Sequence, residues 1–487
     1  MAISGQSYKK LFSNTLIFAI GSFGSKLLVL ILVPLYTAAL SPDQYGTVDL
    51  VAQTANILLP IFTLSAADAA LRFGLDAKTD EQRSGVYTTL LGLVAAGLAV
   101  MALIFPLISK LGYLDGFTLI LYIYVWTAAL KQLNATFVRS LEKVKLFAFD
   151  GVLTTFLMIL FNILFLLKFK WGMTGYLLAI ILSDLSSSVF LFLAAGLYKY
   201  VRPRSFSLSA LKDMLRYCAP LVPTTLLWLV TSISDRFIIT YFHGQGMNGI
   251  NTVAYKIPTI VTTVFTMFSQ AWNMSAIQEN REEGRESFYT RVFSFNQSFM
   301  YVLAAGILLI NRPLTYVWVN SAYHEAMLYS PILTLATVFT CFNVFLGSVY
   351  IAEKRTKRSF ATSLAAGVIN IVLNFILIPK FGIYGAAGAT FAAYFSVFFF
   401  RLFDTEKIIR FEFSMPKILI NTALLIFMTA LNQFSRIWIY PALAAIFIIV
   451  FALNLGELLK IGSLLIPAKV FERFPAAAKI FGVNSQK

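Results

Sequence analysis

The sequence predicts an all-α membrane protein of about fourteen transmembrane helices. Hydrophobic blocks of about twenty residues recur along the 487-residue chain, each ended by a short polar break. The composition is 58% hydrophobic and only 13% charged, and the mean hydropathy is +0.76. A bilayer core about 30 Å thick needs roughly 20 apolar residues per helix, and lipid leaves no partner for unsatisfied backbone amides. The blocks are continuously apolar, which excludes the alternating pattern of a membrane β-barrel.

Each expected helix corresponds to one hydrophobic block. Their approximate spans are 12–38, 46–71, 85–109, 116–138, 149–168, 173–197, 214–242, 251–277, 288–310, 327–352, 359–379, 382–402, 417–434 and 437–458. The first block is too long for the apolar region of a signal peptide and lacks a small-x-small cleavage site near its end. We therefore expect it to be an uncleaved helix.

The positions of the basic residues predict the orientation. With the N-terminus inside, only six of the 39 Lys and Arg residues fall on the outer side and four lie within helices, so most are cytoplasmic. The six outer residues are Lys110, Lys168, Lys170, Arg312, Lys380 and Arg436. The run at residues 353–358 (EKRTKR) is the plainest inner loop, where basic side chains set topology and contact anionic lipids. We expect a multi-pass protein of the bacterial cytoplasmic membrane with both termini in the cytoplasm.

The sequence also contains an internal repeat. Asn162, Lys168-Phe169 and Gly172-x-x-Gly175 recur in order as Asn374, Lys380-Phe381 and Gly382-x-x-Gly385, and Tyr45-Gly46-Thr47-Val48 has a weaker echo at Asn248-Gly249-Ile250. Repeats of this kind commonly form two lobes around a site near the membrane midplane. The predicted division is an N-lobe of six helices at 1–200, a cytoplasmic linker at 201–213, a six-helix C-lobe at 214–402, two further helices at 403–458, and an interfacial cytoplasmic tail at 459–487.

Several functional classes find no support in the sequence. Cys218 and Cys341 form no metal spacing, and His243 and His324 are isolated, so neither a metal site nor a cofactor is expected. The net charge of +16 is spread over many small loops, which argues against nucleic acid. No outer loop holds a carboxylate pair or a nucleophile with its base, so we expect a transporter and not an enzyme. A Walker A motif is also absent, which argues against direct use of ATP.

The candidate site consists of the ionisable residues at membrane depth, because charges there usually face a cavity or a partner. The candidate substrate-binding residues are the cations Lys26, Arg72, Lys131, Arg236 and Lys256. The candidates for ion coupling or counter-charge are Asp68, Asp235 and Asp184. Asp68 and Arg72 can pair across one helical turn, Asp184 can bond to its neighbouring serines, and Asp49 and Asp150 are expected to be hydrated. Several fixed cations in a low-dielectric wall attract a multivalent anion, and phosphate or pyrophosphate is the natural candidate.

An ordered set of segments resembles one known family. The segments are Gly21-Ser22-Phe23-Gly24-Ser25-Lys26, Pro34-Leu35-Tyr36-Thr37, Tyr45-Gly46-x-x-Asp49-Leu50, Arg72-Phe73, Pro220-Leu221-Val222-Pro223, Asp235-Arg236 and Ala254-Tyr255-Lys256. They resemble the Wzx-type flippases of the multidrug/oligosaccharidyl-lipid/polysaccharide (MOP) exporter superfamily. The resemblance implies two lobes facing each other in a V, a cationic central cavity, alternating access, and an undecaprenyl-pyrophosphate-linked oligosaccharide as the substrate.

Two alternatives stay open at this point. One is a small-molecule antiporter of the same superfamily, and the other is a membrane glycan polymerase or ligase. A polysaccharide polymerase is also a candidate partner of a flippase. The sequence does not identify the glycan or the coupling ion.

Overall fold

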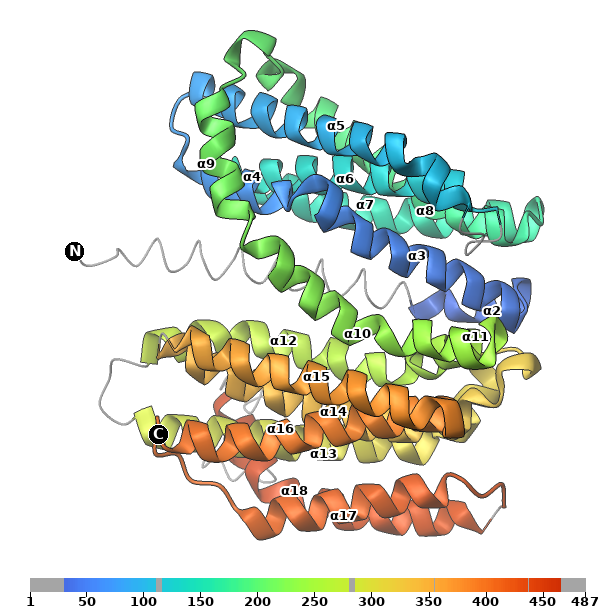
Figure 1. The fold of residues 1–487 in the computed structure, drawn as a ribbon. Helices are drawn as coiled ribbons and strands as arrows, with labels where there is room; N and C mark the ends of the chain where they lie inside the picture. Colours follow the sequence, from blue (N-terminus) through green and yellow to red (C-terminus); the bar gives the residue numbers. More distant parts are fainter. Residues whose placement is uncertain (1–29, 111–115, 280–284, 354, 437, 466–487) are drawn as a thin grey trace, which may run out of the picture. The chain divides into compact units, whose positions relative to one another are not determined.

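The computed structural model describes residues 30–110, 116–279, 285–353, 355–436 and 438–465 (Figure 1). All regular elements in these ranges are helices, as the apolar blocks predict. The chain forms two compact units, residues 1–252 and 253–487. Of the first expected helix only the end is described, as α2 (Val33–Ala39). Lys26 lies outside the described residues.

The first unit is organised around one central helix, α6 (Thr118–Ser140), which packs on five others. These are α3 (Pro42–Thr63), α4 (Ala66–Asp76), α5 (Asp80–Lys110), α7 (Val144–Asn162) and α8 (Gly172–Ala194). A π-helical turn, η1 (Ile163–Lys168), continues α7. Two short turns, η2 (Leu197–Tyr200) and η3 (Pro203–Ser205), lead into α9 (Leu208–Cys218), α10 (Leu221–His243) and α11 (Gln245–Ala254), which runs to the unit boundary.

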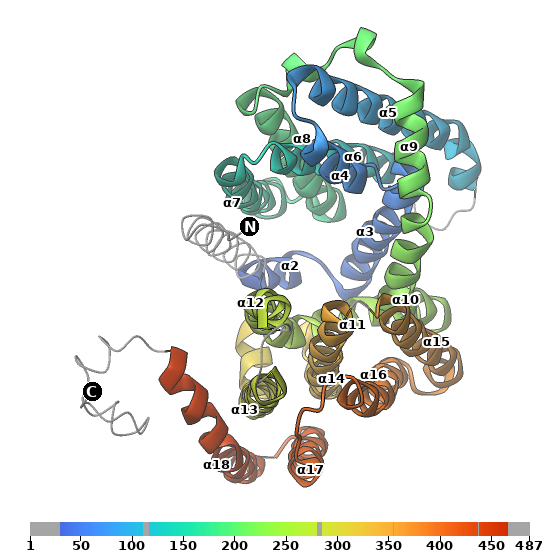
Figure 2. The same ribbon diagram turned by 90° about the vertical axis from the view of Figure 1, so that its left-hand side faces the viewer.

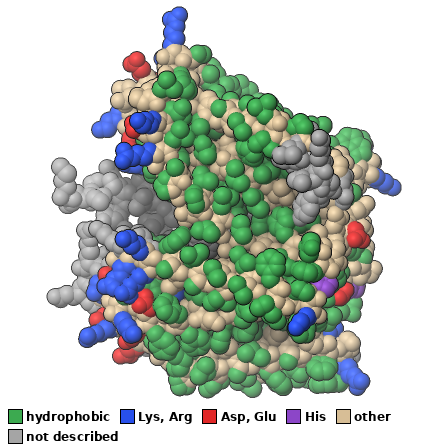
Figure 3. Space-filling model, viewed as in Figure 1, with side chains coloured by type: hydrophobic (Ala, Val, Ile, Leu, Met, Phe, Trp, Pro, Cys, Tyr) green, Lys and Arg blue, Asp and Glu red, His purple; other side chains and the backbone are tan. Residues whose placement is uncertain are grey.

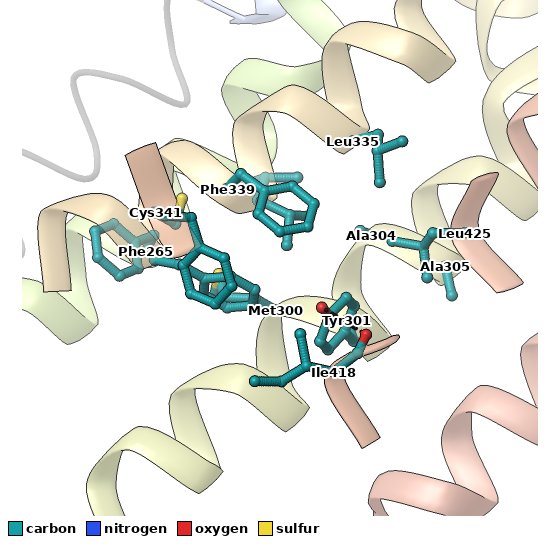
Figure 4. Close-up of a cluster of buried hydrophobic side chains, with 14 of the residues drawn as sticks. Phe265, Met300, Tyr301, Ala304, Ala305, Leu335, Phe339, Cys341, Ile418 and Leu425 are labelled. Carbon is teal, nitrogen blue, oxygen red and sulfur yellow. Dashed lines mark hydrogen bonds between the residues drawn. The ribbon is translucent and has the colours of Figure 1, made fainter. Parts of the chain in front are cut away.

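The second unit is also organised around one helix, α14 (Ala326–Ala352). Figure 2 shows α14 between α12 and α13 on one side and α15 and α16 on the other, and the packing agrees. The helices are α12 (Lys256–Glu279), α13 (Arg285–Trp318), α15 (Thr356–Phe381), α16 (Ile383–Glu406), α17 (Met415–Leu431) and α18 (Ile439–Leu465), with a short turn η4 (Ser321–Tyr323) before α14. The core at α13 and α14 is rich in aromatic rings (Figure 4), and Tyr301 in it bonds Thr422 Oγ1 of α17 at 2.7 Å.

The predicted membrane-spanning segments are largely confirmed. Nine helices in the described ranges are long and apolar enough to cross a bilayer, and the bent pair α3–α4 makes ten. The helices α6, α12 and α17 coincide with three further expected spans. Hydrophobic side chains cover most of the face in Figure 3 along the helices, while Lys and Arg lie mainly near the helix ends. The protein is therefore a multi-pass membrane protein with an all-α fold.

Three expected spans are broken where the sequence predicted continuous helices. The second is bent by 50° between α3 and α4, where Leu64 and Ser65 adopt left-handed backbone angles. The seventh begins earlier than expected, with the amphipathic α9, and is interrupted at Ala219–Pro220 before α10. The eighth is divided at Tyr255 between α11 and α12. Hydropathy did not show these breaks, because most residues around each of them are apolar or small.

The two turns of the internal repeat share a positive φ at their first glycine. Gly172 and Gly382, which begin the two Gly-x-x-Gly motifs, have φ of 56° and 55°, a region that favours glycine. The first copy has two more residues before its glycine, and one of them, Lys170, is also left-handed. The lobes predicted at 1–200 and 214–402 remain a prediction. The compact units divide after Thr252, and α10 packs on α3 within the first unit.

The end of α17 is held to α13 through a buried arginine. Arg312 on α13 is 5% exposed and donates from Nε and Nη2 to the carbonyl of Asn432 at 3.0 and 2.7 Å. Asn432 follows the last residue of α17, where helix carbonyls need partners. Its side chain donates in turn to the carbonyl of Leu308 at 3.1 Å. This network fixes α17 against the core of the second unit.

Candidate functional site

A partly buried ion pair lies halfway along two helices of the first unit. Lys131 is the fourteenth of 23 residues in α6, and Asp184 is the thirteenth of 23 in α8. Lys131 Nζ lies 2.6 Å from Asp184 Oδ1, and the two side chains are 28% and 12% exposed. A charged lysine halfway along a membrane span faces a hydrated space or a partner, because exposure to lipid is costly. The pair therefore places charge close to the middle of the predicted membrane.

A second carboxylate lies near this pair. Asp150 on α7 is 3% exposed and accepts a hydrogen bond from Ser187 Oγ at 2.6 Å. It is close enough to Lys131 and Asp184 for their charges to act on it. The expectation that Asp150 is hydrated was wrong, and Ser187 bonds to Asp150 instead of to Asp184. Asp184 has Lys131 as its partner, because α6 packs directly against α8.

The second ion pair joins α3 to α10. Arg236 Nη1 donates to Asp49 Oδ1, and the side chains are only 16% and 9% exposed. Asp49 also accepts from Gln53 Nε2 at 3.3 Å and from Asn248 Nδ2 at 3.4 Å. The carboxylate is thus surrounded by donors from three helices. The expectation that Asp49 is hydrated was wrong, because its position near the start of α3 is covered by α10 and α11.

Two glycines allow the close helix contact beside this pair. A methyl group on Gly46 of α3 would overlap the carbonyl oxygen of Gln245, and one on Gly249 of α11 would overlap that of Pro42. Asn248 Nδ2 also donates to the Gly46 carbonyl at 3.2 Å. These glycines belong to the two segments that echo each other in the sequence. The echo therefore marks two helix segments whose backbones touch.

Several tyrosines of the first unit lie in the neighbourhood of the two ion pairs. Tyr36 and Tyr176 pack edge to face with ring centroids 4.8 Å apart, and Tyr45 lies 6.1 Å from Tyr176. Tyr176 lies within the electrostatic reach of Asp49 and Arg236. Tyr124 lies within reach of both Asp184 and Asp49. Buried tyrosines of the first unit therefore lie in the same region as the two ion pairs.

The other predicted site residues are placed differently. Arg72 on α4 is exposed and pairs with Asp76 at 3.1 Å, instead of with Asp68, which is also exposed. Both carboxylates are one helical turn from Arg72, and spacing alone could not choose between them. Asp235 is 4% exposed, and its Oδ1 accepts from the backbone N–H of Arg236 at 2.9 Å.

Lys256 begins α12 in the second unit and is half-buried. The structure therefore joins Lys131 and Asp184 in one pair and gives Arg236 the partner Asp49, which sequence reasoning missed. The sequence did contain a signal that Asp49 is buried. Asp49 lies one helical turn after Gly46, so it is on the face of α3 that packs closely against another helix. Among the described residues, no three His, Cys, Asp or Glu side chains are grouped closely enough to hold a metal ion.

Comparison with known proteins identifies the family. A sequence profile of the polysaccharide biosynthesis protein family matches residues 11–278, a little more than half of the chain. The chain belongs to the polysaccharide biosynthesis protein family. The matched range contains both ion pairs of the candidate site.

Two curated relatives match a smaller part of the chain than the family profile does. Two uncharacterized membrane proteins of Methanocaldococcus jannaschii are 24% identical over 196 residues, which is 38% and 40% of this chain. The match spans 37% and 46% of those two proteins, less than half of their length.

Solved structures show which fold this family member has. It is similar to the lipid II flippase MurJ in an inward closed conformation, with a TM-score of 0.68 and 15% identity over 90% of this chain and 98% of that one. It is also similar to a multidrug resistance MATE family transporter of the MOP superfamily in an inward-facing conformation, with a TM-score of 0.65 and 16% identity over 80% and 98%. The fold is therefore that of the MATE and MurJ transporters.

Proposed function

We propose that the protein is a flippase that moves polyprenyl-pyrophosphate-linked oligosaccharide repeat units across the bacterial cytoplasmic membrane. The observation that carries this proposal is the ion pair of Lys131 and Asp184, placed halfway along α6 and α8 with the lysine still partly exposed. A lysine in this position can bind an anion at the depth where the headgroup of a lipid-linked sugar must cross. The family match and the likeness to a lipid II flippase support the same substrate class.

The pairing of the cations suggests how the anion would bind. Lys131 and Arg236 each already hold a carboxylate, so they are not an uncompensated positive cluster. In our proposal the pyrophosphate replaces Asp184 on Lys131 and Asp49 on Arg236, and arginine can offer it two parallel N–H donors. The carboxylates keep the cations in place while no substrate is bound. The sugars follow the headgroup, and the polyprenyl tail stays in lipid.

The contact between α3 and α10 suggests where the protein would open and close. In the predicted division Asp49 belongs to the N-lobe and Arg236 to the C-lobe. Replacing Asp49 by the substrate phosphate would remove one bond that holds these helices together at that end. Substrate binding and opening would thus be linked through one ion pair. An inside-negative membrane potential also favours the outward movement of an anion, at about 2.3 kcal/mol per charge per 100 mV.

One experiment separates a flippase from an enzyme. Deleting the gene in its native host should leave complete lipid-linked repeat units on the cytoplasmic face, because a transporter does not change its substrate chemically. The units are then probed on intact cells with an impermeant sugar-modifying reagent, with permeabilised cells as the control. Repeat units that are modified freely from outside would contradict the proposal and favour a polymerase or ligase, since polymerisation follows translocation.

The likeness to MATE transporters favours one other function, a small-molecule antiporter. The same deletion strain distinguishes it. Loss of an antiporter should leave the lipid-linked repeat units at their normal level and change only sensitivity to exported compounds. Accumulated repeat units with unchanged sensitivity would support the flippase.

A further inference from the structure

A groove of about 270 Å³ lies between α15 and α16 in the second unit, far along the chain from the ion pairs described above. The two helices lie side by side in Figure 1 and pack closely. The groove wall is almost entirely apolar and includes Ala361, Ala365, Ile369, Val397 and Phe400. Small residues on α15 leave the space, while Phe400 is 60% exposed at its edge. A groove of this kind accepts a flexible hydrocarbon chain.

The groove begins one turn after a basic helix end. Arg358, Thr362, Ala365 and Ile369 are three or four residues apart, so they share one face of α15. At 1.5 Å per residue, the distance from Arg358 to Ile369 along the helix is roughly 17 Å. The hydrocarbon of one leaflet is half of a core about 30 Å thick. The groove face therefore has the depth of one leaflet, measured from the end that carries the charge.

The polar end of the groove carries an excess of positive charge. Arg355, Lys357 and Arg358 are all exposed, and Arg358 Nη1 bonds Asp404 Oδ1 at 2.8 Å. The side chains of Arg355 and Lys357 have no hydrogen bond or ion pair with any residue that the structure describes. Two cations at this end are therefore available to an anionic group outside the protein.

A buried arginine behind the groove adds to this positive potential. Arg401 on α16 is 5% exposed and forms no ion pair with a carboxylate in the described ranges. Its guanidinium is held by neutral acceptors, among them Thr362 Oγ1 at 2.9 Å and Ser363 Oγ at 2.7 Å. Thr362 itself lines the groove. A buried charge that is solvated only by dipoles keeps its field, so it favours an anion nearby.

We propose that this groove is a binding site for an anionic phospholipid, with one acyl chain between α15 and α16 and the phosphate at Arg355 and Lys357. Basic pockets between transmembrane helices on the cytoplasmic side bind lipid headgroups of this kind. A zwitterionic lipid would bind less tightly, because its own ammonium group is repelled by the same cations. A polyprenyl chain is much longer than one leaflet, so the groove depth favours a phospholipid. The proposal does not depend on the flippase function.

The test is lipid retention by the purified full-length protein, measured by native mass spectrometry after delipidation. Phosphatidylglycerol, phosphatidylcholine and undecaprenyl phosphate are added back separately and then in competition. The variant Ala365→Trp fills the groove, and Leu364→Trp places the same side chain at the neighbouring position that does not line it. Lys357→Gln removes an exposed charge, and Lys212→Gln removes one on α9 in the other unit.

The expected result is that phosphatidylglycerol is retained in preference to both other lipids. Ala365→Trp should abolish this retention, whereas Leu364→Trp should keep it. Lys357→Gln should weaken it about fivefold, which corresponds to about 1 kcal/mol per basic residue at the surface, and Lys212→Gln should not change it. Equal retention of phosphatidylcholine, stronger retention of undecaprenyl phosphate, or equal effects of the two tryptophan variants would each overturn the proposal. Because Lys357 is exposed, its variant keeps the test decisive if Ala365→Trp does not fold.

Discussion

Lys131 and Arg236 are the two cations of the first unit that the structure places beside buried aspartates. Each pair joins two helices, and each carboxylate has at least one further polar or charged neighbour. In a low-dielectric interior, such pairs contribute little net stability while both partners are present, but losing one partner is costly. The pairs are therefore suited to exchange one anion for another.

The first residue-scale prediction concerns this exchange at Lys131. Asp184→Asn removes the carboxylate that competes for the ammonium, so a polyprenyl pyrophosphate should bind about tenfold more tightly, in line with a charged hydrogen bond of about 1.5–3 kcal/mol. Binding is measured by titration of the purified protein in detergent. Lys131→Met should abolish the gain, also in combination with Asp184→Asn. Unchanged affinity in Asp184→Asn would mean that Lys131 does not contact the substrate.

The second residue-scale prediction compares a buried pair with an exposed one. Arg236→Gln leaves Asp49 without its cation and should reduce the free energy of unfolding by about 3 kcal/mol. Arg72→Gln breaks the exposed pair with Asp76 and should cost less than 1 kcal/mol, as roughly expected for a surface pair.

Thermal unfolding measures both costs. A thiol-reactive dye reports it directly, because both cysteines are buried in the folded protein. The double variant Asp49→Asn/Arg236→Gln should recover part of the loss. Equal losses at the two arginines would show that the pair of α3 and α10 is not shielded from water.

For single residues, the sequence identified the two cations of the ion pairs but not the carboxylates that pair with them. Residue type and membrane depth identify Lys131 and Arg236 as groups that need compensation. Helix packing determines which carboxylate lies beside each cation, and this packing cannot be deduced from the sequence. Asp49 and Asp150 stand near the ends of predicted spans, where water normally satisfies a carboxylate, and only the neighbouring helices show that both are buried.

The helices α3 and α11 meet through glycines, and this contact leaves no room for added volume. Gly46 and Gly249 bring two backbones together beside the Asp49–Arg236 pair. Small residues allow membrane helices to approach closely, and van der Waals packing and hydrogen bonds then hold them. A single methyl group at this contact must move a helix.

The element-scale prediction uses two glycine variants. Gly249→Ala should destabilise the protein by about 2 kcal/mol, since overpacked contacts typically cost 1–3 kcal/mol. Gly151→Ala on α7 is the control, because a methyl group there has open space, and it should be neutral or slightly stabilising through helix propensity. The same dye-monitored unfolding measures both. A neutral Gly249→Ala would show that α3 and α11 are not in contact in the membrane.

The sequence predicted where helices lie better than where they break. Thirteen of the expected spans have a counterpart among the described helices, because a long apolar block has few alternatives in lipid. The bend at Leu64 and Ser65 and the break at Tyr255 have only Pro60 and Pro258 as nearby sequence signals, and neither proline stands at the break itself. The groove between α15 and α16 was equally invisible, since its residues look like any other apolar face.

The two units of the molecule use equivalent helices in different ways. The offset of 212 residues between Asn162 and Asn374 takes Lys131 to Asn343 on α14, and the offset of 210 between Gly175 and Gly385 takes Asp184 to Tyr394 on α16. Asn343 Nδ2 donates to the Tyr394 carbonyl at 2.7 Å. The same two positions are thus in contact in both units, as a charged pair in the first and a neutral hydrogen bond in the second.

The whole-molecule prediction concerns orientation. Tyr241→Cys at the end of α10 should react with an impermeant maleimide on intact cells, because the basic loops place that end outside. Lys357→Cys should react only after the membrane is permeabilised. Both positions are exposed, and the native cysteines are buried, so background labelling should be small. The opposite labelling pattern would reverse the topology and place the anionic lipid site in the outer leaflet.

The ion pair of α6 also has a consequence for how the chain is made. Lys131 is synthesised 53 residues before Asp184, so α6 leaves the ribosome without its counter-charge. α6 is also not among the helices that are apolar enough to cross a bilayer on their own composition. Its insertion therefore has to wait at the translocon, or in contact with other helices, until α8 arrives. In a nascent chain that is stopped before α8, α6 should be inserted in the membrane only unstably. Quality-control proteases would then recognise the incomplete helix bundle by a lysine exposed to lipid.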